Sequence, residues 1–447
     1  MLFGTSGIRD FYGSAITPEL AMRIANAFAS KGNKVAVASD LRQTSELLKS
    51  AAISGVLSAG ADAIDLGAVP TPTLALYTQE KECAGMMITA SHNPSEYNGL
   101  KLYRGGREVS RAEEGEVERK YGNGMRLCGW KEAGRVFAYP DAAKDHIGMA
   151  VRNVDSAAVR KAKIKVVVDT NGVATEVAPL LLRELGCETF EINRVERGFA
   201  RPSEPNDANL SKLKTEVRTR NAHLGIGHDG DADRAIIVDE NGELLGLDVQ
   251  FAIAIAHELG KPGTRSGKPA VVSTVEASLL IKETVEKNGG RNIVVGVGST
   301  NVSEAMEKEE GAVFGGEPAG EFIYRGGVNT PDGMMVAAKF LEILAKEGKL
   351  SGLKRKYSAY PILREKFRCA DRKKAMEILG RKLPAQEFLK AAKLNAIDGM
   401  RFDFPDGFLL VRPSGTESMI RLTAEFKTEK RLREIAGAAQ KMIRESV

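Results

Sequence analysis

Two consecutive segments, "AKIKVVVDTNG" at 162–172 and "TEVAPLLLRELG" at 175–186, decide the fold. The first is a short apolar run that ends in polar turn residues, which is typical of a buried strand. The second has apolar residues at helical spacing and ends in glycine. The same strand-then-helix order occurs at 34–40 ("KVAVASD"), with a helical pattern from Ser45, and at 268–278 ("KPAVVSTVEAS"), before "LLIKETVEKNGG". This repetition predicts similar α/β domains with mixed, mostly parallel sheets.

The C-terminal part of the chain has a different pattern. A charged helical stretch at 372–394 precedes "DGMRFDFPDGFLLVRPSGTESMIRLTAEF" at 398–426, which indicates strands joined by Asp-Gly turns. An amphipathic helix at 429–446 closes the chain. We therefore expect three similar α/β domains and a C-terminal α+β domain, with the boundaries 1–150, 151–250, 251–362 and 363–447.

The composition is that of an ordinary globular protein. Of 447 residues, 43% are apolar and 28% charged, and the net charge is +5, too small to suggest a nucleic-acid binder. The four cysteines form no close pair, which argues against a zinc knuckle or a disulfide framework. The first ten residues lack the pattern of a signal peptide, and no run of 18 apolar residues occurs. We expect a cytoplasmic protein without a membrane span.

The stretch "TASHNPSEYNGLK" at 89–101 follows the apolar run "CAGMMI" directly. Its serine, Ser91, is either an ordinary turn residue or a nucleophile. A serine hydroxyl needs help from a metal or a base, because its pKa lies far above neutral pH. Lys101 could act as a general acid or base for a hydroxyl group if its pKa is lowered.

Three carboxylates at a spacing of two, Asp229, Asp231 and Asp233, share one side of a near-extended loop. They repel one another unless a cation lies between them, and oxygen ligands favour Mg²⁺ ahead of Ca²⁺. An EF-hand loop is excluded because Arg234 stands where its sharp turn needs glycine, and because the flanks are strand-like. The alternative is a solvated acidic turn.

Two further loops have the residues of a ligand site. In "LLVRPSGTESMIR" at 409–421, a Ser-Gly-Thr turn lies between two arginines, which predicts a phosphate site rather than an ordinary turn. The pattern is not a Walker loop. In "GAVFGGEPAGEFIY" at 311–324, Glu317 follows a Gly-Gly pair and could accept hydrogen bonds from vicinal sugar hydroxyls. The alternative is a loop with an exposed glutamate. The opening "FGTSGIRD" at 3–10 contributes Arg9 and indicates little by itself.

Four of these stretches, "TASHNP…NGLK", "DGDADR", "GGEPAG" and "RPSGTES", resemble in order and spacing the motifs of the α-D-phosphohexomutases, over essentially the whole chain. The opening "FGTSGIR" is most similar to that of phosphoglucosamine mutases, particularly archaeal ones. The resemblance implies an isomerase that interconverts hexose 6-phosphates and hexose 1-phosphates, with four domains around a central cleft. It favours glucosamine phosphate, with mannose or glucose phosphate as the alternative.

The resemblance also implies roles for residues. Ser91 would be carried as a phosphoserine, and Mg²⁺ would bind one of its oxygens and the three aspartates. Lys101 would be the general acid/base, His92 would assist, and Arg9 and Arg234 would support the phosphoryl site. The phosphoryl group would pass to the substrate, and the resulting 1,6-bisphosphate would reorient and return its other phosphate. A trace of hexose 1,6-bisphosphate would act as an activator.

One distal site must accept phosphate from either end of the sugar. The resemblance assigns this site to Arg412, Ser414, Gly415, Thr416 and Arg421. Glu317 would read the sugar hydroxyls. The sequence departs from the family pattern at two positions of the sugar loop, where Ala319 replaces a serine and Glu321 replaces a histidine. Glu321 could favour an aminosugar, because its carboxylate attracts an ammonium group.

Two other functions remain open on the sequence alone. A metal-dependent phosphatase would explain the serine and the aspartates but not the separate phosphate site and sugar loop. A non-catalytic sensor of sugar phosphates would bind without turnover. The expected partner is a phosphorylated hexose or hexosamine, with no nucleic acid or membrane, and the expected state is a monomer or homodimer.

Overall fold

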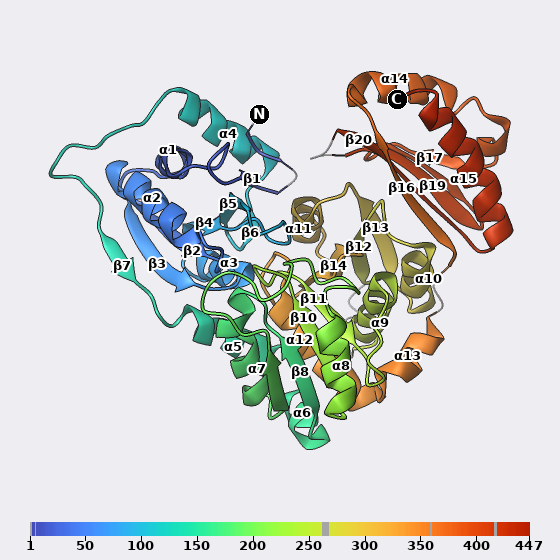
Figure 1. Cartoon of the computed structure of the whole chain (residues 1–447), viewed down its shortest axis with the longest axis horizontal. Helices are drawn as coiled ribbons and strands as arrows, with labels where there is room; N and C mark the ends of the chain where they lie inside the picture. Colours follow the sequence, from blue (N-terminus) through green and yellow to red (C-terminus); the bar gives the residue numbers. More distant parts are fainter. Residues whose placement is uncertain (1, 5, 262–267, 358–359, 415–417) are drawn as a thin grey trace. The chain divides into compact units, whose positions relative to one another are not determined.

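The chain folds into two compact units, described here from a computed structural model that covers residues 2–4, 6–261, 268–357, 360–414 and 418–447 (Figure 1). The first unit consists of residues 1–250 and 319–356, and the second of residues 251–318 and 357–447. Both units are therefore discontinuous in sequence. Among the described residues, no helix combines the length and apolarity that crossing a bilayer requires.

A seven-stranded mixed sheet opens the first unit, in the order β1-β5-β4-β2-β3-β7 with β6 beside β5. β2 is parallel to β3 and β4, whereas β5 is antiparallel to β1 and β4. The strands are β1 (Ile8–Phe11), β2 (Lys34–Ser39), β3 (Asp62–Ala68), β4 (Ala84–Ile88), β5 (Tyr97–Arg104), β6 (Arg107–Glu108) and β7 (Val136–Ala138). The helices are α1 (Pro18–Phe28), α2 (Ser45–Ser58), α3 (Thr71–Glu80) and α4 (Arg111–Gly122).

Helices α1 and α2 lie side by side over this sheet (Figure 1). Thr17 starts α1 by accepting a hydrogen bond from the backbone N–H of Leu20 at 3.1 Å, and Pro18 follows at the first helical position. A Cβ at Gly55 of α2 would lie 2.0 Å from the carbonyl oxygen of Met22. The two helices therefore depend on this glycine for their close approach.

The second sheet of the first unit has the order β11-β10-β8-β9, with β11 antiparallel to the other three strands. Its strands are β8 (Lys165–Asp169), β9 (Glu188–Ile192), β10 (Leu224–His228) and β11 (Ala235–Val238). Its helices are α5 (Ala142–Arg152), α6 (Ser156–Ala162), α7 (Ala178–Glu184) and α8 (Ser211–Thr219). The later segment of the unit, residues 319–356, contains α12 (Gly333–Glu347), α13 (Leu350–Lys356) and β15 (Glu321–Tyr324), a strand that is not part of this sheet.

The second unit begins with parallel strands in the order β13-β12-β14 and ends with an antiparallel sheet, β16-β20-β19-β18-β17. The elements of the first part are α9 (Leu247–Leu259), β12 (Ala270–Thr274), α10 (Leu279–Lys287), β13 (Arg291–Val295), α11 (Ser299–Lys308) and β14 (Ala312–Glu317). Those of the second are β16 (Ile362–Arg368), α14 (Arg372–Lys382), β17 (Lys393–Asn395), β18 (Met400–Phe404), β19 (Gly407–Pro413), β20 (Met419–Phe426) and α15 (Glu429–Arg444).

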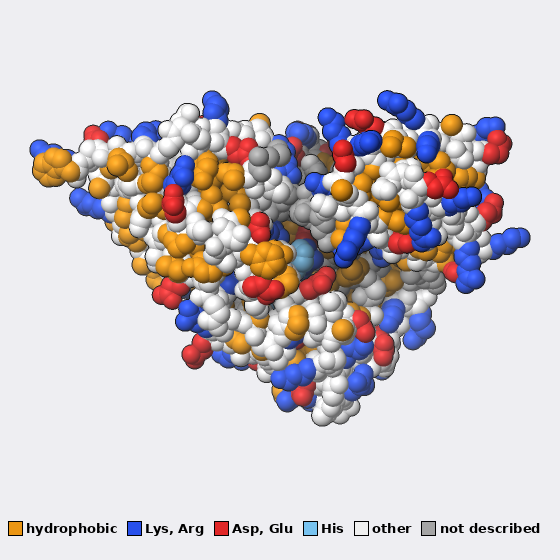
Figure 2. All heavy atoms as spheres, turned by 45° about the horizontal axis from the view of Figure 1, so that its top comes forward, with side chains coloured by type: hydrophobic (Ala, Val, Ile, Leu, Met, Phe, Trp, Pro, Cys, Tyr) orange, Lys and Arg blue, Asp and Glu red, His pale blue; other side chains and the backbone are white. Residues whose placement is uncertain are grey.

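The predicted fold class is confirmed, because three mixed or parallel α/β sheets are followed by an antiparallel sheet with helices. One local prediction differs from the structure. The helix expected over 372–394 ends at Lys382, since Pro384 cannot continue it, and the stretch closes as strand β17. Figure 2 shows basic and acidic side chains interspersed over the visible face, which agrees with the small net charge.

Candidate active site

Ser91 lies in the loop between β4 and β5, with only 1% of its surface exposed. Its φ angle of 48° is in the left-handed region, which is uncommon for a residue other than glycine and often marks a functional site. The backbone N–H donates to Oγ1 of Thr89 at 2.8 Å. The hydroxyl donates to Oδ2 of Asp229 at 2.8 Å, across 138 residues of sequence. The fold therefore brings the candidate nucleophile to the aspartate loop.

A buried arginine, Arg42, binds the backbone of the serine loop. Its guanidinium donates to the carbonyl oxygens of Ser91, Asn93, Pro94 and Tyr97 at 2.5–3.0 Å. Its Nε lies 3.0 Å from Oδ2 of Asp40, in an ion pair whose side chains are both fully buried. Burial raises the pKa of Asp40, and the positive charge of Arg42 counteracts this effect. A planar guanidinium has enough donors for several carbonyls at once, which lysine lacks.

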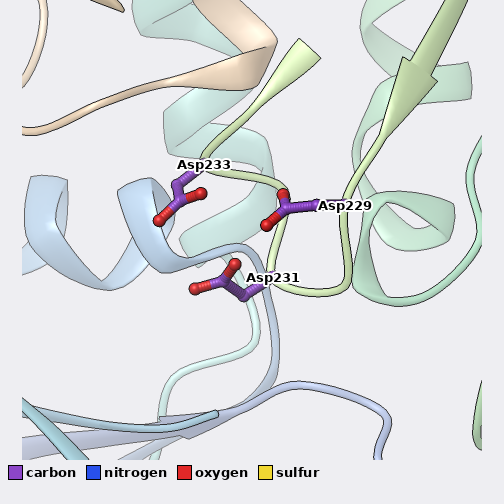
Figure 3. A group of neighbouring side chains, drawn as sticks. All are labelled: Asp229, Asp231 and Asp233. Atoms are coloured by element: carbon purple, nitrogen blue, oxygen red, sulfur yellow. The ribbon is translucent and has the colours of Figure 1, made fainter. Parts of the chain in front are cut away.

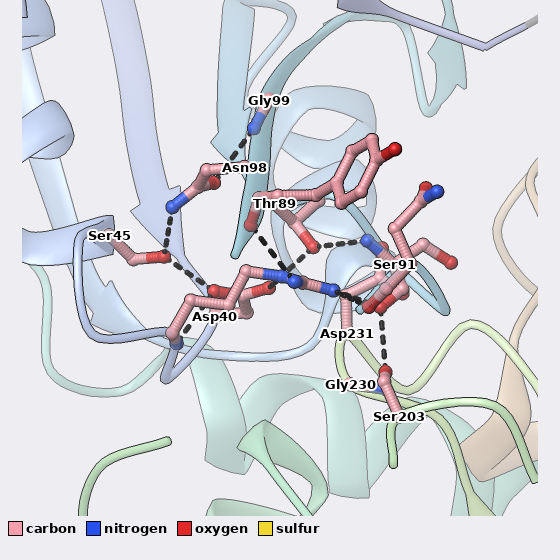
Figure 4. Close-up of polar contacts among 12 residues, drawn as sticks. Asp40, Ser45, Thr89, Ser91, Asn98, Gly99, Ser203, Gly230 and Asp231 are labelled. Atoms are coloured by element: carbon pink, nitrogen blue, oxygen red, sulfur yellow. Dashed lines mark hydrogen bonds and ion pairs between the residues drawn. The ribbon is translucent and has the colours of Figure 1, made fainter. Parts of the chain in front are cut away.

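Hydrogen bonds of Ser203 also connect the serine loop to the aspartate loop (Figure 4). The hydroxyl of Ser203 donates to the carbonyl oxygen of Ser91 at 2.7 Å, and the N–H of Gly230 donates to the same hydroxyl at 3.0 Å. Arg42, Asp40 and Ser203 are not among the residues predicted from the sequence. A signal existed for the first two, because "SDLR" at 39–42 follows an apolar strand, where parallel sheets commonly place ligand-binding groups.

Asp229, Asp231 and Asp233 lie in the loop between β10 and β11, and their side chains converge (Figure 3). One oxygen of each carboxylate lies within 4.8 Å of one oxygen of the others, and all three residues are buried. The hydroxyl of Thr71, at the start of α3, donates to Oδ2 of Asp231 at 2.6 Å. Lys101 on β5 places Nζ 3.0 Å from Oδ2 of Asp231 and 2.9 Å from Oδ2 of Asp233.

The electrostatics of this cluster fit a bound cation. Burial and the neighbouring carboxylates raise the pKa of Asp229 well above its usual value and that of Asp233 to about 6. Burial also acts on Asp231, but Lys101 and the Thr71 hydroxyl hold its pKa below the usual value. Within the described part of the chain, Oδ1 of Asp231 and Oδ1 of Asp233 accept no hydrogen bond. A divalent cation would satisfy these buried oxygens without donors and would offset the repulsion that raises the pKa of Asp229 and Asp233.

Lys101 differs from the expectation in one respect. Burial tends to lower its pKa, but Asp231 and Asp233 raise it well above the usual value. A general base needs a lowered pKa, so Lys101 is a proton-bearing cation in this arrangement. Any loss of its proton requires that the charge of the two carboxylates be neutralised first.

The other predicted residues of the phosphoryl site lie in the same unit. The charge of Arg234, followed by burial and the charge of Arg9, lowers the pKa of His92 to about 2, so its imidazole is neutral. Its Nδ1 is 3.5 Å from Oγ of Ser91. Arg234 forms an ion pair with Glu321, the first residue of β15. Glu321 therefore already has a cationic partner from the protein.

The residues predicted for sugar and distal phosphate lie elsewhere in the chain. Glu317, at the end of β14, accepts a hydrogen bond from the N–H of Gly298 at 3.1 Å. Arg412, at 5% exposure, forms ion pairs with Glu276 at 2.9 Å and Asp398 at 3.2 Å.

The rest of the predicted set follows. Ser414 is buried and donates its N–H to the carbonyl oxygen of Met419 at 2.9 Å. Arg421 lies on β20, opposite Arg412 on β19. Ala319 lies in the turn before β15, partly buried. Gly415 and Thr416 lie outside the described residues.

The comparisons with known proteins agree along the whole chain. Residues 1–126, 144–242 and 248–360 match the α/β/α domains I, II and III of the phosphoglucomutase/phosphomannomutase family, and residues 365–441 match its C-terminal domain. A "probable phosphoglucosamine mutase" of Methanopyrus kandleri is 39% identical over 454 residues, covering 100% of this chain and 98% of that protein. A second, of Methanocella arvoryzae, is 38% identical and covers 99% and 96%.

A solved structure has the same fold. The phosphoglucomutase/phosphomannomutase family protein of Burkholderia thailandensis superposes with a TM-score of 0.84 at 25% identity, over 100% of this chain and 97% of that one. The serine loop, the aspartate cluster and these matches lead to one assignment. The chain belongs to the phosphoglucomutase/phosphomannomutase family of phosphohexomutases and is an isomerase of the phosphosugar mutase class.

Proposed function

We propose that the chain interconverts glucosamine 6-phosphate and glucosamine 1-phosphate, with Ser91 carrying the phosphoryl group. The observation that carries the proposal is the contact of Ser91 Oγ with Asp229 inside a buried cluster of three carboxylates. The choice of sugar is supported by full-length relatives named as probable phosphoglucosamine mutases. Mannose and glucose phosphates are the alternative, because the family description includes both activities.

We propose that Asp229, Asp231 and Asp233 hold Mg²⁺ together with an oxygen of the phosphorylated Ser91. When bound, the ion supplies positive charge beside the carboxylates and the transferring phosphoryl group. The carboxylates orient the ion site, and the Thr71 hydroxyl fixes Asp231 at 2.6 Å. Arg9 and Arg234 add positive charge around the serine, as their effect on the pKa of His92 indicates.

Lys101 Nζ would take the proton of the sugar hydroxyl that receives the phosphoryl group, once the charge of Asp231 and Asp233 is neutralised. It would return this proton to the sugar oxygen from which the other phosphoryl group leaves. Arg42 binds the backbone of the serine loop, and this keeps Oγ of Ser91 directed at the aspartates. The Ser91 hydroxyl is buried away from water. Exclusion of water favours transfer to a sugar hydroxyl over hydrolysis. His92, neutral and 3.5 Å from Oγ, orients the serine without adding charge.

We propose that Arg412, Ser414 and Arg421, with Gly415 and Thr416, bind the phosphate that is not transferred, and that Glu317 binds sugar hydroxyls. Nε of Arg412 has no hydrogen-bond partner among the described residues, which leaves it a donor for an anion. The division into four domains at 150, 250 and 362, a monomeric or homodimeric state, and a cytoplasmic location stay predictions.

The decisive experiment follows phosphorus NMR spectra of the enzyme with Mg²⁺ and a trace of hexose 1,6-bisphosphate. Glucosamine 6-phosphate, glucose 1-phosphate and mannose 1-phosphate are supplied separately. Interconversion of 1- and 6-phosphates is expected, fastest with the glucosamine phosphate. Ser91→Ala should abolish it, whereas Ser54→Ala, at an exposed position of α2, should not. A growing inorganic phosphate signal without isomer would instead indicate a phosphatase.

Glu321 has a separate test because the ion pair with Arg234 bears on its role. If the carboxylate attracts a substrate ammonium group, Glu321→Gln should reduce the preference for glucosamine over glucose phosphate. An unchanged preference, measured as the ratio of kcat/KM values, would restrict Glu321 to holding Arg234.

A further inference from the structure

A buried chain of hydrogen bonds joins three helices of the first unit. Oγ1 of Thr73 on α3 lies 2.7 Å from Nδ1 of His146 on α5, and Nε2 of His146 lies 3.0 Å from Oδ2 of Asp332 before α12. Their exposures are 1%, 0% and 1%. A histidine bonded at both ring nitrogens has a fixed orientation, so the three helices are held at fixed separations. This chain has no part in the proposed mechanism.

One end of the chain adjoins the aspartate loop through α3. Thr71, two residues before Thr73, donates its hydroxyl to Oδ2 of Asp231 at 2.6 Å and its N–H to the carbonyl oxygen of Asp231 at 2.9 Å. Both threonines belong to the first turn of the helix. The bond from Thr73 to His146 therefore fixes the turn that holds Asp231.

The other end adjoins the same loop through α12. Oδ1 of Asp332 accepts from the N–H groups of Met334 and Met335 at 2.9 and 3.1 Å, which caps the helix. The next residue, Gly333, donates its N–H to the carbonyl oxygen of Ala232 at 3.3 Å. A Cβ at Gly333 would lie 2.7 Å from that oxygen. The start of α12 thus contacts the backbone between two of the carboxylates.

We propose that His146 is a positioning residue for the metal loop: by tying Thr73 to Asp332 it sets the spacing of the two helix starts that hold the three aspartates. The inference rests on the proposed function, since it concerns affinity for the divalent cation. A buried histidine with both nitrogens bonded is often a purely structural residue. Here both of its partners adjoin residues that contact the aspartate loop, at Asp231 on one side and Ala232 on the other.

The test uses matched variants of one helix. Thr73→Val removes the hydroxyl and keeps the shape, and Thr73→Ser restores it. Thr78→Val is the control, because Thr78 lies on the same helix and is fully buried. Its hydroxyl donates to the carbonyl oxygen of Ala75 at 2.8 Å and accepts from the N–H of Gly106 at 3.1 Å, and neither partner belongs to the aspartate loop. Affinity for Mg²⁺ is measured by calorimetry and by the rise of Tm with added MgCl₂.

We expect Thr73→Val to weaken Mg²⁺ binding about tenfold, the lower end of the effect of residues around metal ligands. The loss of kcat should recover at saturating Mg²⁺, with KM for the sugar phosphate unchanged. Thr73→Ser should bind as the unmodified protein does, and Thr78→Val should lower Tm without changing the affinity. His146→Gln, whose amide reaches one partner at most, should repeat the effect if Thr73→Val does not fold.

Two results would overturn the inference alone: unchanged Mg²⁺ affinity in Thr73→Val and His146→Gln, or an equal loss in Thr78→Val. If the unmodified protein itself bound no Mg²⁺, the metal assignment of the proposed function would fail, and the inference with it.

Discussion

Removal of the Arg42 guanidinium tests how the serine loop is built. In Arg42→Met, four carbonyl oxygens lose donors at 2.5–3.0 Å, and the carboxylate of Asp40 stays buried without its cation. Breaking a buried ion pair by removing one partner costs about 3–5 kcal/mol. In domains of about 150–250 residues, each kcal/mol lost from the free energy of unfolding lowers Tm by roughly 3 °C. We therefore expect Arg42→Met to lower Tm by about 10 °C or more.

The direction of the pH dependence follows from Asp40. Burial raises its pKa above the usual value even with Arg42 present. A carboxyl with a raised pKa in the folded state costs stability as pH rises through its unfolded value. Without Arg42 the pKa rises further, so the Tm deficit of Arg42→Met should shrink toward pH 4.5 and grow toward pH 7.

The assay is differential scanning calorimetry between pH 4.5 and 7, with phosphoryl transfer measured in parallel. The double variant Asp40→Asn/Arg42→Met removes the stranded charge and should be more stable than Arg42→Met by about 1 kcal/mol or more. Lys31→Met, which breaks an exposed pair with Glu132 at 2.7 Å, should leave Tm nearly unchanged. A double variant less stable than the single one would refute the reasoning.

Two further predictions concern stability. Burial raises the pKa of Glu114 to about 7, so the folded protein keeps a proton that the unfolded chain loses above about pH 4.5. Stability should therefore fall as pH rises from 4.5 to 7. Glu114→Gln should flatten this decline in Tm, and an unchanged slope of Tm against pH would contradict the prediction. In Gly115→Ala, on α4, the added Cβ has no atom within 4 Å, so the variant should raise the free energy of unfolding by up to about 1 kcal/mol through helix propensity. In Gly55→Ala the added Cβ would lie 2.0 Å from the Met22 carbonyl oxygen, so this variant should lower Tm. Equal shifts of Tm in the two glycine variants would refute the packing argument.

Apolar patterning predicts the fold class, and the resemblance of four motifs to those of the phosphohexomutases predicts the function; both are confirmed. Asp229, Asp231 and Asp233 converge as their spacing predicts, but the loop is not near-extended. It turns at residues 230–231, and Ala232 has a φ of 57°, so the carboxylates meet through a turn. The position of Arg42 after an apolar strand marks it as a candidate for a site, but its actual role could not be predicted. It binds backbone carbonyls some 50 residues away, and these carbonyls leave no trace in the side-chain pattern.

The protonation states were also beyond the sequence. A lowered pKa for Lys101 was the condition for a base. Burial tends to lower this pKa, but the two carboxylates within 3.0 Å of Nζ raise it well above the usual value. The neutral form of His92 depends on Arg234 and Arg9 approaching from other segments. Such values depend on three-dimensional charge placement, which local sequence does not encode.

The discontinuity of the first unit has a consequence for biosynthesis. Residues 319–356 return to the first unit only after the 251–318 segment has been made. They supply Glu321, the ion-pair partner of Arg234, and Asp332, the partner of His146. During translation, which proceeds from the N-terminus at about 5–20 residues per second, the serine and aspartate loops are complete in sequence several seconds before these partners emerge. A nascent chain thus has Ser91 before the contacts that complete the surroundings of the serine and aspartate loops, and a truncated product would be released without these contacts.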